Sequence, residues 1–325
     1  MSIYKYATKN PANWLITGAC EEDAATREQL ASGGVVAITH HDHRAMLDEV
    51  ECDVVAVGDY YSRRGSLIME ALRRGKHVIA DKPICTKLSE YDEIAGLIAD
   101  RQLIITAQLD LRFSPRLRLA RELVRDGAIG KALSVSLTGQ HALSIGVRPA
   151  WYFEEGRHGG TINDIGIHAF DLIPWITGLD CVEIVAARTW NALALPYPHF
   201  NDGAQFMVRL SNGAGFMGDM SYFAPGKYKG TLPQYWRLTL FGDEGVLETG
   251  PGGDLMLCRN GRDAPEMFTP SPLAACDNLP ESFAREIAGA DNPLAPSTRE
   301  VLRASRAALA VQQAADTGET GVLLD

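Results

Sequence analysis

At the centre of the chain stands His158-Gly159-Gly160-Thr161-Ile162-Asn163-Asp164-Ile165-Gly166-Ile167-His168-Ala169-Phe170-Asp171-Leu172-Ile173-Pro174-Trp175, a glycine pair followed by an apolar run with helical periodicity. Asp164, His168 and Asp171 are spaced i, i+4 and i+7, so on a helix they share a stripe about 60° wide. A second, apolar stripe lies beside it, and we expect that stripe to face the core. The pattern fits either a helix with one solvated face or an active-site helix. We favour the active-site helix, because the polar stripe carries only carboxylates and imidazole, which lose hydration beside a core.

The composition limits the class of protein and its partners. The chain has 325 residues, of which 46% are hydrophobic and 22% charged, as is typical of a soluble globular protein. Its net charge of −10 argues against nucleic acid and anionic membranes as partners, since both attract a cationic surface. No apolar run approaches the roughly 20 residues of a membrane span, and the N-terminus lacks the features of a signal peptide.

The cysteines and histidines indicate neither a disulfide framework nor a metal site. Six cysteines are scattered along the chain without a Cys-x-x-Cys pair, which favours a reducing, cytoplasmic location. The cluster His40-His41-Asp42-His43 resembles a metal site at first sight. Adjacent residues do not easily converge on one ion, however, so we interpret the cluster as a solvated loop and predict no metal.

Short buried strands alternate with helices in the first third of the chain. The predicted strands are residues 15–20, 35–38, 53–58, 77–80 and 103–107, and the predicted helices are residues 24–31, 44–49, 64–74 and 88–100. This alternation predicts an α/β domain with a parallel, doubly wound, Rossmann-like sheet over residues 1–113.

Ligands of such a sheet bind at the carboxyl ends of its strands. The residues that we predict there, as contacts for a dinucleotide cofactor, are Glu21, Asp59, Tyr60, Asp81, Lys82 and Pro83. An acidic residue at the end of the second strand of a dinucleotide-binding unit bonds the adenosine ribose. Glu21 therefore favours NAD over NADP, whose 2′-phosphate a carboxylate repels.

A dinucleotide-binding domain begins with a strand that runs into Gly-x-Gly-x-x-Gly, and no such motif lies upstream of Leu15. Residues 4–9 resemble the end of the helix that should follow the motif. We consider two hypotheses: Met1 is an internal methionine of a longer natural chain, or the domain is truncated and leaves an unpaired sheet edge with weak dinucleotide binding.

The pattern of predicted strands and helices changes after Ala107, and residues 114–325 predict an α+β domain. A helix is expected over residues 116–125, and longer, alternating strands over residues 133–138, 182–189, 204–210, 215–222 and 236–241. This pattern indicates a largely antiparallel open sheet with helices on one face. Helices are also expected at residues 282–289 and 298–315. The open sheet favours pairing with a second copy, so we predict a homodimer or homotetramer.

Three motifs together resemble the Gfo/Idh/MocA oxidoreductases: Gly75-Lys76-His77-Val78, Asp81-Lys82-Pro83, and the stretch from Gly159 to Asp171. That family has Glu-Lys-Pro or a close variant at the end of a Rossmann strand. Its second domain carries Gly-Gly-x-x-x-Asp-x-Gly-x-His-x-x-Asp. The resemblance implies hydride transfer between NAD or NADP and a hydroxyl-bearing carbon of a sugar, cyclitol or related polyol.

The resemblance also implies roles for individual residues. Lys82 would bond the reacting hydroxyl, His168 would be the general acid/base, and Asp164 would contact the substrate and bias the charge of the other two. Because hydride leaves carbon only as the hydroxyl loses its proton, a base titrating near neutrality is needed independently of any resemblance. The candidates for the substrate cleft are Arg112, Trp151, Tyr152, His199, Tyr222 and Tyr228.

Two departures keep other functions open. Asp59-Tyr60-Tyr61-Ser62 replaces the family's Thr-Pro-Asn-His-like turn, and the glycine loop is absent. One alternative is a redox-neutral enzyme, a glycosidase or epimerase, that uses tightly held NAD on the same scaffold. The other alternative is a non-catalytic ligand-binding protein that has lost its cofactor loop.

Overall fold

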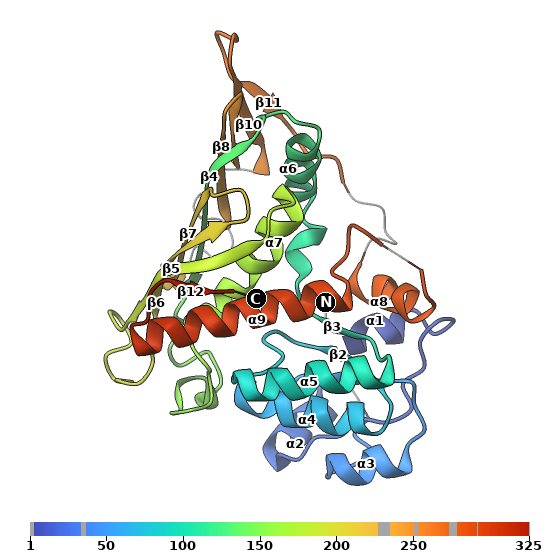
Figure 1. The fold of residues 1–325 in the computed structure, drawn as a ribbon. Helices are drawn as coiled ribbons and strands as arrows, with labels where there is room; N and C mark the ends of the chain where they lie inside the picture. The colour runs from blue at the N-terminus through green and yellow to red at the C-terminus, as the bar shows by residue number, and fades with distance from the viewer. Residues whose placement is uncertain are drawn as a thin grey trace.

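The N-terminal part of the molecule is built on a small parallel sheet. A computed structural model describes residues 3–33, 37–226, 235–249, 253–272, 278–290 and 292–324. Within them, β1 (Val54–Val57), β2 (His77–Ala80) and β3 (Ile105–Ala107) pair in parallel in the order β1-β2-β3. The connecting helices α4 (Tyr61–Arg73) and α5 (Leu88–Arg101) pack side by side on this sheet (Figure 1). The predicted Rossmann-like α/β fold is confirmed.

In its described residues, the segment before β1 contains helices but adds no strand to that sheet. It contains α1 (Ile3–Lys9), α2 (Ala24–Ser32) and α3 (His43–Glu49). The strand predicted at residues 15–20 is wrong: the described residues there make only one isolated parallel bridge, between Cys20 and His40. The reason is the lack of a packing surface, since Leu15 is 83% exposed. The strand predicted at residues 35–38 falls partly outside the described residues, and the remainder is not a strand.

The C-terminal part is built on a nine-stranded sheet with the order β11-β10-β9-β8-β4-β7-β6-β5-β12. All its neighbouring pairs are antiparallel except β4 with β7, which run parallel. The strands are β4 (Ala132–Ala142), β5 (Cys181–Trp190), β6 (Gly203–Leu210), β7 (Gly215–Ala224), β8 (Arg237–Gly242), β9 (Gly245–Thr249), β10 (Leu255–Arg259), β11 (Glu266–Phe268) and β12 (Val322–Leu323). The predicted, largely antiparallel sheet is confirmed.

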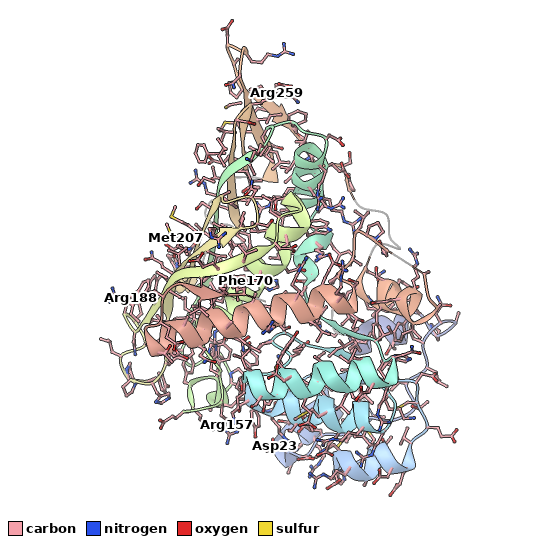
Figure 2. All side chains as sticks on the ribbon, viewed as in Figure 1. Asp23, Arg157, Phe170, Arg188, Met207 and Arg259 are labelled. Atoms are coloured by element: carbon pink, nitrogen blue, oxygen red, sulfur yellow. The ribbon has the colours of Figure 1, made fainter. Side chains whose placement is uncertain are left out.

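Helices cover one face of the large sheet and leave the other face open. The covering helices are α6 (Pro115–Arg125), α7 (Ile167–Thr177) and α9 (Thr298–Thr317), with η1 (Asp110–Phe113) leading into them (Figure 1). Phe170 of α7, labelled inside the molecule in Figure 2, stacks on Phe206 of β6 at a ring distance of 5.0 Å. Met207, the next residue of β6, points away from the helices and is 42% exposed. This alternation is the reason for the period of two in the sequence.

The last two helices return to the N-terminal part. In α8 (Leu279–Ile287), Glu281 accepts a 2.6 Å hydrogen bond from the Tyr6 hydroxyl. Thr298, at the start of α9, exchanges hydrogen bonds with the Ile105 backbone of β3. The division at residues 113 and 114 stays a prediction, since residues after 278 pack on both parts. None of the described helices has the length and apolar character needed to cross a membrane.

Candidate active site

An ion pair joins the two parts of the chain at the end of β2. Lys82 follows that strand, and its Nζ donates to Asp164 Oδ1 and to the Asp164 carbonyl oxygen, each at 2.6 Å. Asp164 is 2% exposed, whereas the side chain of Lys82 is 20% exposed. The carboxyl end of a parallel strand thus meets the predicted active-site helix, as the fold requires of a ligand site.

The other carboxylate oxygen of Asp164 is held by two tyrosines. Oδ2 accepts hydrogen bonds from the Tyr152 hydroxyl, at 2.6 Å, and from the Tyr222 hydroxyl, and it lies 3.5 Å from Nε2 of His158. Burial alone would raise the pKa of Asp164, but Lys82 and His158 hold it well below its usual value. Asp164 is therefore a carboxylate at neutral pH, fixed in position by donors from several elements.

The glycine pair before this helix is required by close packing. Gly159 and Gly160 have φ angles of 77° and 94°, which favour glycine. A Cβ on Gly159 would lie 2.3 Å from Thr86, and one on Gly160 would lie 2.2 Å from Gln312 of α9. The chain then enters a π-helical turn, η3 (Ile162–Gly166), before α7 begins. Turns of this kind often occur at functional sites.

A pocket of about 570 Å³ opens onto the ion pair. Lys82 and Asp164 line it, together with aromatic and basic side chains that include Tyr61, His141, Arg148, Tyr152 and Tyr235. Arg148 lies over the ring of Tyr152, with its guanidinium carbon 4.4 Å from the ring centroid. The pocket has the size and the convergent polar groups of a small-molecule site.

Two imidazoles lie near Lys82, although the sequence predicted only His168. His168 is 5% exposed, packs edge-on against Trp236 at 5.0 Å, and is not among the described residues that line the pocket. Its Nδ1 has no hydrogen-bond partner in the described part of the chain. His141, at the end of β4, does line the pocket. Burial and the charge of Lys82 lower the pKa of both imidazoles, that of His141 to about 4.

The buried state of His141 predicts a loss of stability in mild acid. Below the ordinary pKa of 6.5 the unfolded chain binds a proton that the folded protein does not bind until about pH 4. The free energy of unfolding therefore falls as pH decreases through this window, by about 3 kcal/mol in total from this residue. Replacement of His141 by asparagine should remove that part of the decrease. The free energy of unfolding in urea is measured for the unaltered protein and for the His141→Asn variant at about pH 7 and about pH 5. An equal decrease between the two pH values in both proteins would contradict the assignment.

Arg112 lies away from the pocket and belongs to a buried ion pair. Its guanidinium is fully buried and donates three bonds of 2.6 to 3.1 Å to the carboxylate of Asp171 on α7. It also lies 3.1 Å from Glu300 of α9 and donates to the carbonyl oxygen of Ala295. The predicted role of Arg112 in substrate binding has no support in this geometry, so we assign Arg112 and Asp171 to stability.

The other predicted substrate residues divide between two places. Tyr152 and Tyr222 hold Asp164, as described above, and Trp151 packs edge-on against Tyr61 with ring centroids 5.1 Å apart. His199 lies instead in a second pocket, of about 600 Å³, where its Nε2 is 2.7 Å from the Phe153 carbonyl oxygen. Tyr228 lies outside the described residues.

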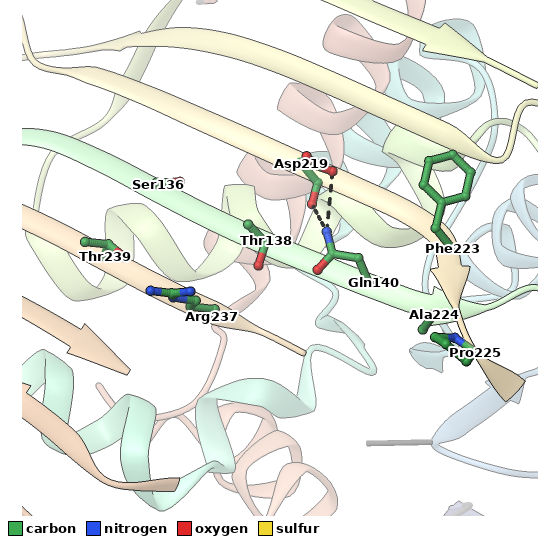
Figure 3. A pocket seen from close by; sticks show the side chains of 9 residues that line it. All are labelled: Ser136, Thr138, Gln140, Asp219, Phe223, Ala224, Pro225, Arg237 and Thr239. Carbon is green, nitrogen blue, oxygen red and sulfur yellow. Dashed lines mark hydrogen bonds between the residues drawn. The ribbon is translucent and has the colours of Figure 1, made fainter. Parts of the chain in front are cut away.

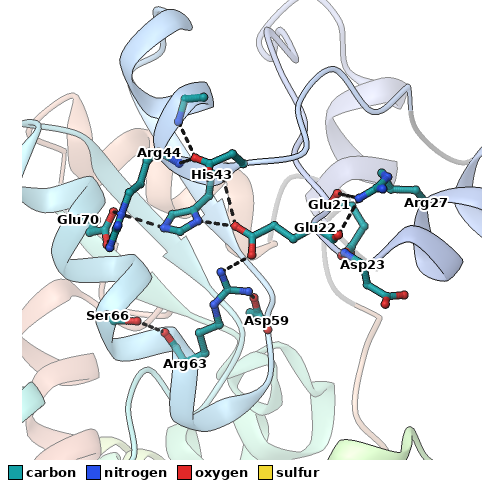
Figure 4. A network of polar contacts seen from close by, with 12 residues as sticks. Glu21, Glu22, Asp23, Arg27, His43, Arg44, Asp59, Arg63, Ser66 and Glu70 are labelled. Atoms are coloured by element: carbon teal, nitrogen blue, oxygen red, sulfur yellow. Dashed lines mark hydrogen bonds and ion pairs between the residues drawn. The ribbon is translucent and has the colours of Figure 1, made fainter.

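One predicted cofactor residue, Asp59, takes part in a surface network around Glu22 (Figure 4). The Glu22 carboxylate lies 2.6 Å from His43 Nδ1 and accepts a 2.6 Å bond from Arg63, which also donates to Asp59 at 2.9 Å. The bond to His43 and the bond to Arg63, opposed by burial, lower the pKa of Glu22 to about 2. This network joins Glu22, which follows the Cys20–His40 bridge, and Asp59, which follows β1, to Arg63 on α4.

The predicted cofactor residues also make local contacts outside the bonds to Glu22. Glu21 accepts the backbone N–H of Asp23, and Asp59 accepts the N–H of Tyr60. Asp81 lies 3.6 Å from the guanidinium of Arg64. Arg64 is 4% exposed and also donates to the backbone oxygens of Lys82 and Pro83, so it fixes the turn that carries Lys82. Sequence reasoning missed this residue.

The described residues around Lys82 and His168 fit the reacting end of a dinucleotide, but the described residues offer no matching site for its pyrophosphate. The unpartnered Nδ1 of His168, beside Lys82, offers a polar atom that a bound ligand can satisfy. The pyrophosphate needs a glycine turn at a helix N-terminus. Among the described residues, α2 begins instead at Asp23, whose carboxylate caps the helix. Gly213-Ala214-Gly215-Phe216-Met217-Gly218 matches the glycine pattern, but it spans the end of the β6–β7 turn and the start of β7 and opens no helix.

In the described part of the chain, no three His, Cys, Asp or Glu side chains converge in a way that could hold a metal ion.

Comparisons with known proteins agree with this arrangement in both parts of the chain. Residues 4–109 match the family described as an oxidoreductase family with an NAD-binding Rossmann fold. Residues 117–248 match the GFO/IDH/MocA C-terminal domain. A putative oxidoreductase from Thermotoga maritima superposes with a TM-score of 0.85 at 24% identity, covering 99% of this chain and 97% of that one.

Curated relatives include levoglucosan dehydrogenase from Pseudarthrobacter phenanthrenivorans, which is 24% identical over 154 residues. That match covers 46% of this chain and 39% of the relative. Myo-inositol 2-dehydrogenase from Thermotoga maritima is 24% identical over 147 residues, covering 45% of this chain and 42% of the relative. The aligned region therefore spans less than half the length of these two relatives.

Proposed function

Because this chain belongs to the Gfo/Idh/MocA family of oxidoreductases, we propose that it transfers a hydride between NAD and a hydroxyl-bearing carbon of a sugar, cyclitol or related polyol. The observation that carries the proposal is the Lys82–Asp164 pair, which faces a polar, aromatic-lined pocket at the end of β2. Two relatives are named for a sugar derivative and a cyclitol as substrates, which supports this class of substrate.

The residues of the pocket suit the chemistry of hydroxyl oxidation. NAD, when bound, accepts the hydride, and the chain must bind the hydroxyl and accept its proton. The ammonium group of Lys82, held on Asp164, stabilises negative charge on the substrate oxygen. His168 is the proposed acid/base. Burial and the charge of Lys82 lower its pKa well below 6.5, so its imidazole is neutral at pH 7 but is a weaker base than the near-neutral group expected from the sequence.

Binding of the cofactor tests this proposal first. The purified protein is titrated with NADH and NADPH while the fluorescence of the cofactor is followed. We expect saturable binding of NADH and weaker binding of NADPH, because Glu21, which we propose contacts the adenosine ribose, would repel the 2′-phosphate. A panel of sugars, cyclitols and polyols with NAD then identifies the substrate through formation of NADH.

Two outcomes of these measurements would favour the alternative functions. If neither cofactor binds saturably while a polyol binds the pocket, this chain is a ligand-binding protein. If a substrate is consumed without net NADH, the redox-neutral alternative holds.

We also propose that two copies pair through the open face of the large sheet. Met207 and Met217 are neighbours in the β6–β7 register and are 42% and 49% exposed, and Phe241 of β8 is 50% exposed. A shallow pocket on the same face is lined by β4, β7 and β8 (Figure 3). In this pocket Gln140 donates a hydrogen bond to Asp219. Polar side chains therefore lie next to the exposed apolar residues Met207, Met217 and Phe241, as at the rim of a protein interface.

This pairing predicts a dimer or a higher oligomer that charge on the face disrupts. Sedimentation should show the unaltered protein as an oligomer and the Met207→Glu, Met217→Glu double variant as a monomer, because burial of two carboxylates is unfavourable. Leu15→Glu, at an exposed site outside the sheet, is the matched control and should leave the oligomer intact. A monomer before any substitution would contradict the proposal.

A cytoplasmic location is part of the same proposal. Five cysteines in the described residues are free: Cys20, Cys52, Cys85, Cys181 and Cys258. Free thiols are usual in reducing compartments, which supports this location.

A further inference from the structure

One arginine of the substrate pocket has a positive charge that no carboxylate of the described residues neutralises. Arg148 lies in the loop after β4 and lines the pocket together with Lys82 and Asp164. Many other arginines of the chain pair with Asp or Glu, and these include Arg44, Arg63, Arg74, Arg112, Arg209 and Arg303. Arg148 makes no such ion pair within the described part of the chain.

The loop after β4 holds one edge of the Arg148 guanidinium. Nε donates to the carbonyl oxygen of Leu143 at 3.0 Å, and Nη2 donates to that of Ala142 at 2.9 Å. The backbone N–H of Arg148 donates to the carbonyl oxygen of Ser144 at 3.1 Å, which closes the turn. The other edge of the guanidinium consists of Nη1 and the second proton of Nη2. That edge donates no hydrogen bond to the described residues, so it is free to bind a ligand.

The rings below Arg148 place it beside the reacting group. Its guanidinium carbon lies 4.4 Å from the ring centroid of Tyr152 and 5.2 Å from that of Tyr222. The hydroxyl groups of both tyrosines donate to Asp164, which also holds Lys82. The two cations of the pocket therefore have fixed positions on one hydrogen-bonded unit.

The other groups of the pocket leave the charge of Arg148 unbalanced. Lys82 and Asp164 neutralise each other, and both carboxylate oxygens of Asp164 already accept hydrogen bonds. His141 is neutral at pH 7, because burial and the charge of Lys82 lower its pKa to about 4. One positive charge therefore remains on the wall of the pocket, although the chain as a whole has a net charge of −10. Such a pocket attracts an anion and favours its binding beside the arginine.

We propose that Arg148 binds a carboxylate group of the substrate, which is therefore a sugar acid of the aldonic or uronic class. The inference rests on the proposed oxidation of a polyol and narrows its class of substrate. The free edge of the guanidinium matches the two oxygens of a carboxylate, and such paired, charge-assisted bonds are stronger than bonds to a neutral hydroxyl. A phosphate ester carries close to two negative charges, and one of them would have no counterion in this pocket.

The first test compares acids with neutral polyols of the same carbon skeleton in turnover with NAD. The pairs are D-gluconate with D-glucitol, D-galactonate with galactitol, and D-glucuronate with D-glucose. We expect kcat/KM to be at least about tenfold higher for the acid of one or more pairs, because only the acid forms charge-assisted bonds with Arg148.

Substitution of Arg148 separates substrate binding from support of the loop. In Arg148→Gln, KM for the preferred acid should rise about 10- to 100-fold, whereas KM for its neutral partner should stay within about threefold. A role limited to the loop would raise both KM values alike, and that result would overturn the inference. The matched control is Arg188→Gln, which removes the same charge from an exposed arginine that stacks on Trp190 (Figure 2). It should retain the preference for the acid.

The second test needs no cofactor and no turnover. Calorimetric titration measures the binding of the same pairs, and of D-glucose 6-phosphate, to the unaltered protein and to Arg148→Gln. In the unaltered protein an acid should bind at least about tenfold more tightly than its neutral partner, and less tightly in about 0.5 M than in about 0.05 M NaCl, because salt screens the charges. Arg148→Gln should lose this preference.

The binding experiment keeps the two proposals apart. If no acid binds more tightly than its neutral partner, or if the phosphate ester binds more tightly than every acid, Arg148 does not select a carboxylate and the inference is wrong. If acids bind with the expected preference but none is oxidised, the proposed function fails, while the assignment of Arg148 to a carboxylate stands.

Discussion

Replacement of Lys82 by alanine should lower kcat by about 10³-fold, because it removes the cation that faces the reacting oxygen. Lys82 is the only lysine among the described residues that line the pocket, and its Nζ is held at 2.6 Å from Asp164. The other cation that lines the pocket, Arg148, is bonded to the backbone oxygens of Leu143 and Ala142. The measurement is steady-state turnover with the cofactor and polyol identified by titration.

A matched control and a second readout separate this role from a structural one. Lys87→Ala, at an exposed lysine that lines the second pocket, should leave kcat unchanged. Because the charge of Lys82 helps to lower the pKa of His141, the Lys82→Ala variant should also show a higher pKa for that imidazole by NMR. Retention of more than about a tenth of normal kcat would contradict the assigned role.

Replacement of Arg112 by alanine should destabilise the protein by about 3–5 kcal/mol, since it leaves a buried carboxylate without its counterion. Asp171 is 1% exposed, and Arg112 provides the hydrogen bonds to both of its oxygens. Glu300 loses a partner in the same variant. The measurement is the free energy of unfolding in urea at neutral pH.

Two further variants complete this test. Joint replacement of Arg112 by methionine and Asp171 by leucine should recover much of the loss, because no unpaired charge is then buried. Arg303→Ala removes an ion pair with Asp180 whose side chains are 37% and 62% exposed, and should cost about 1 kcal/mol or less. If Arg112→Ala lost less than about 1 kcal/mol of unfolding free energy, Asp171 would have found another partner.

The fold could be predicted from the sequence where local patterns decide it. The strands near residues 54–57, 77–80 and 105–107 are short, apolar and separated by amphipathic helices, and the structure contains all three. The strand predicted at residues 15–20 failed because an apolar run forms a strand only beside a partner. At this place Cys20 makes one bridge and Leu15 remains exposed.

The site could be predicted only in part, because its partners come from distant elements. A single polar stripe was expected for Asp164 and Asp171, yet Asp164 pairs with Lys82 whereas Asp171 pairs with Arg112. The two residues differ because Asp164 lies in the π-helical turn Ile162–Gly166, whereas Asp171 lies in α7, and because both are buried and each needs its own partner. His141 carried one local signal, its place at the end of a long alternating strand. His158 carried none, since its partner Tyr222 is 64 residues away in the sequence.

The position of α9 determines when this protein can finish folding during its synthesis. That helix is made after every described strand except β12, yet its first residue bonds to β3, its middle packs on α7 and β5, and Gln312 accepts the backbone N–H of Ile162 beside Asp164. A nascent chain that ends before residue 298 therefore lacks one of the helices that cover the large sheet, and it lacks the bond that holds Ile162. Until α9 is made, the earlier residues are an incomplete intermediate with exposed apolar surface, which favours aggregation.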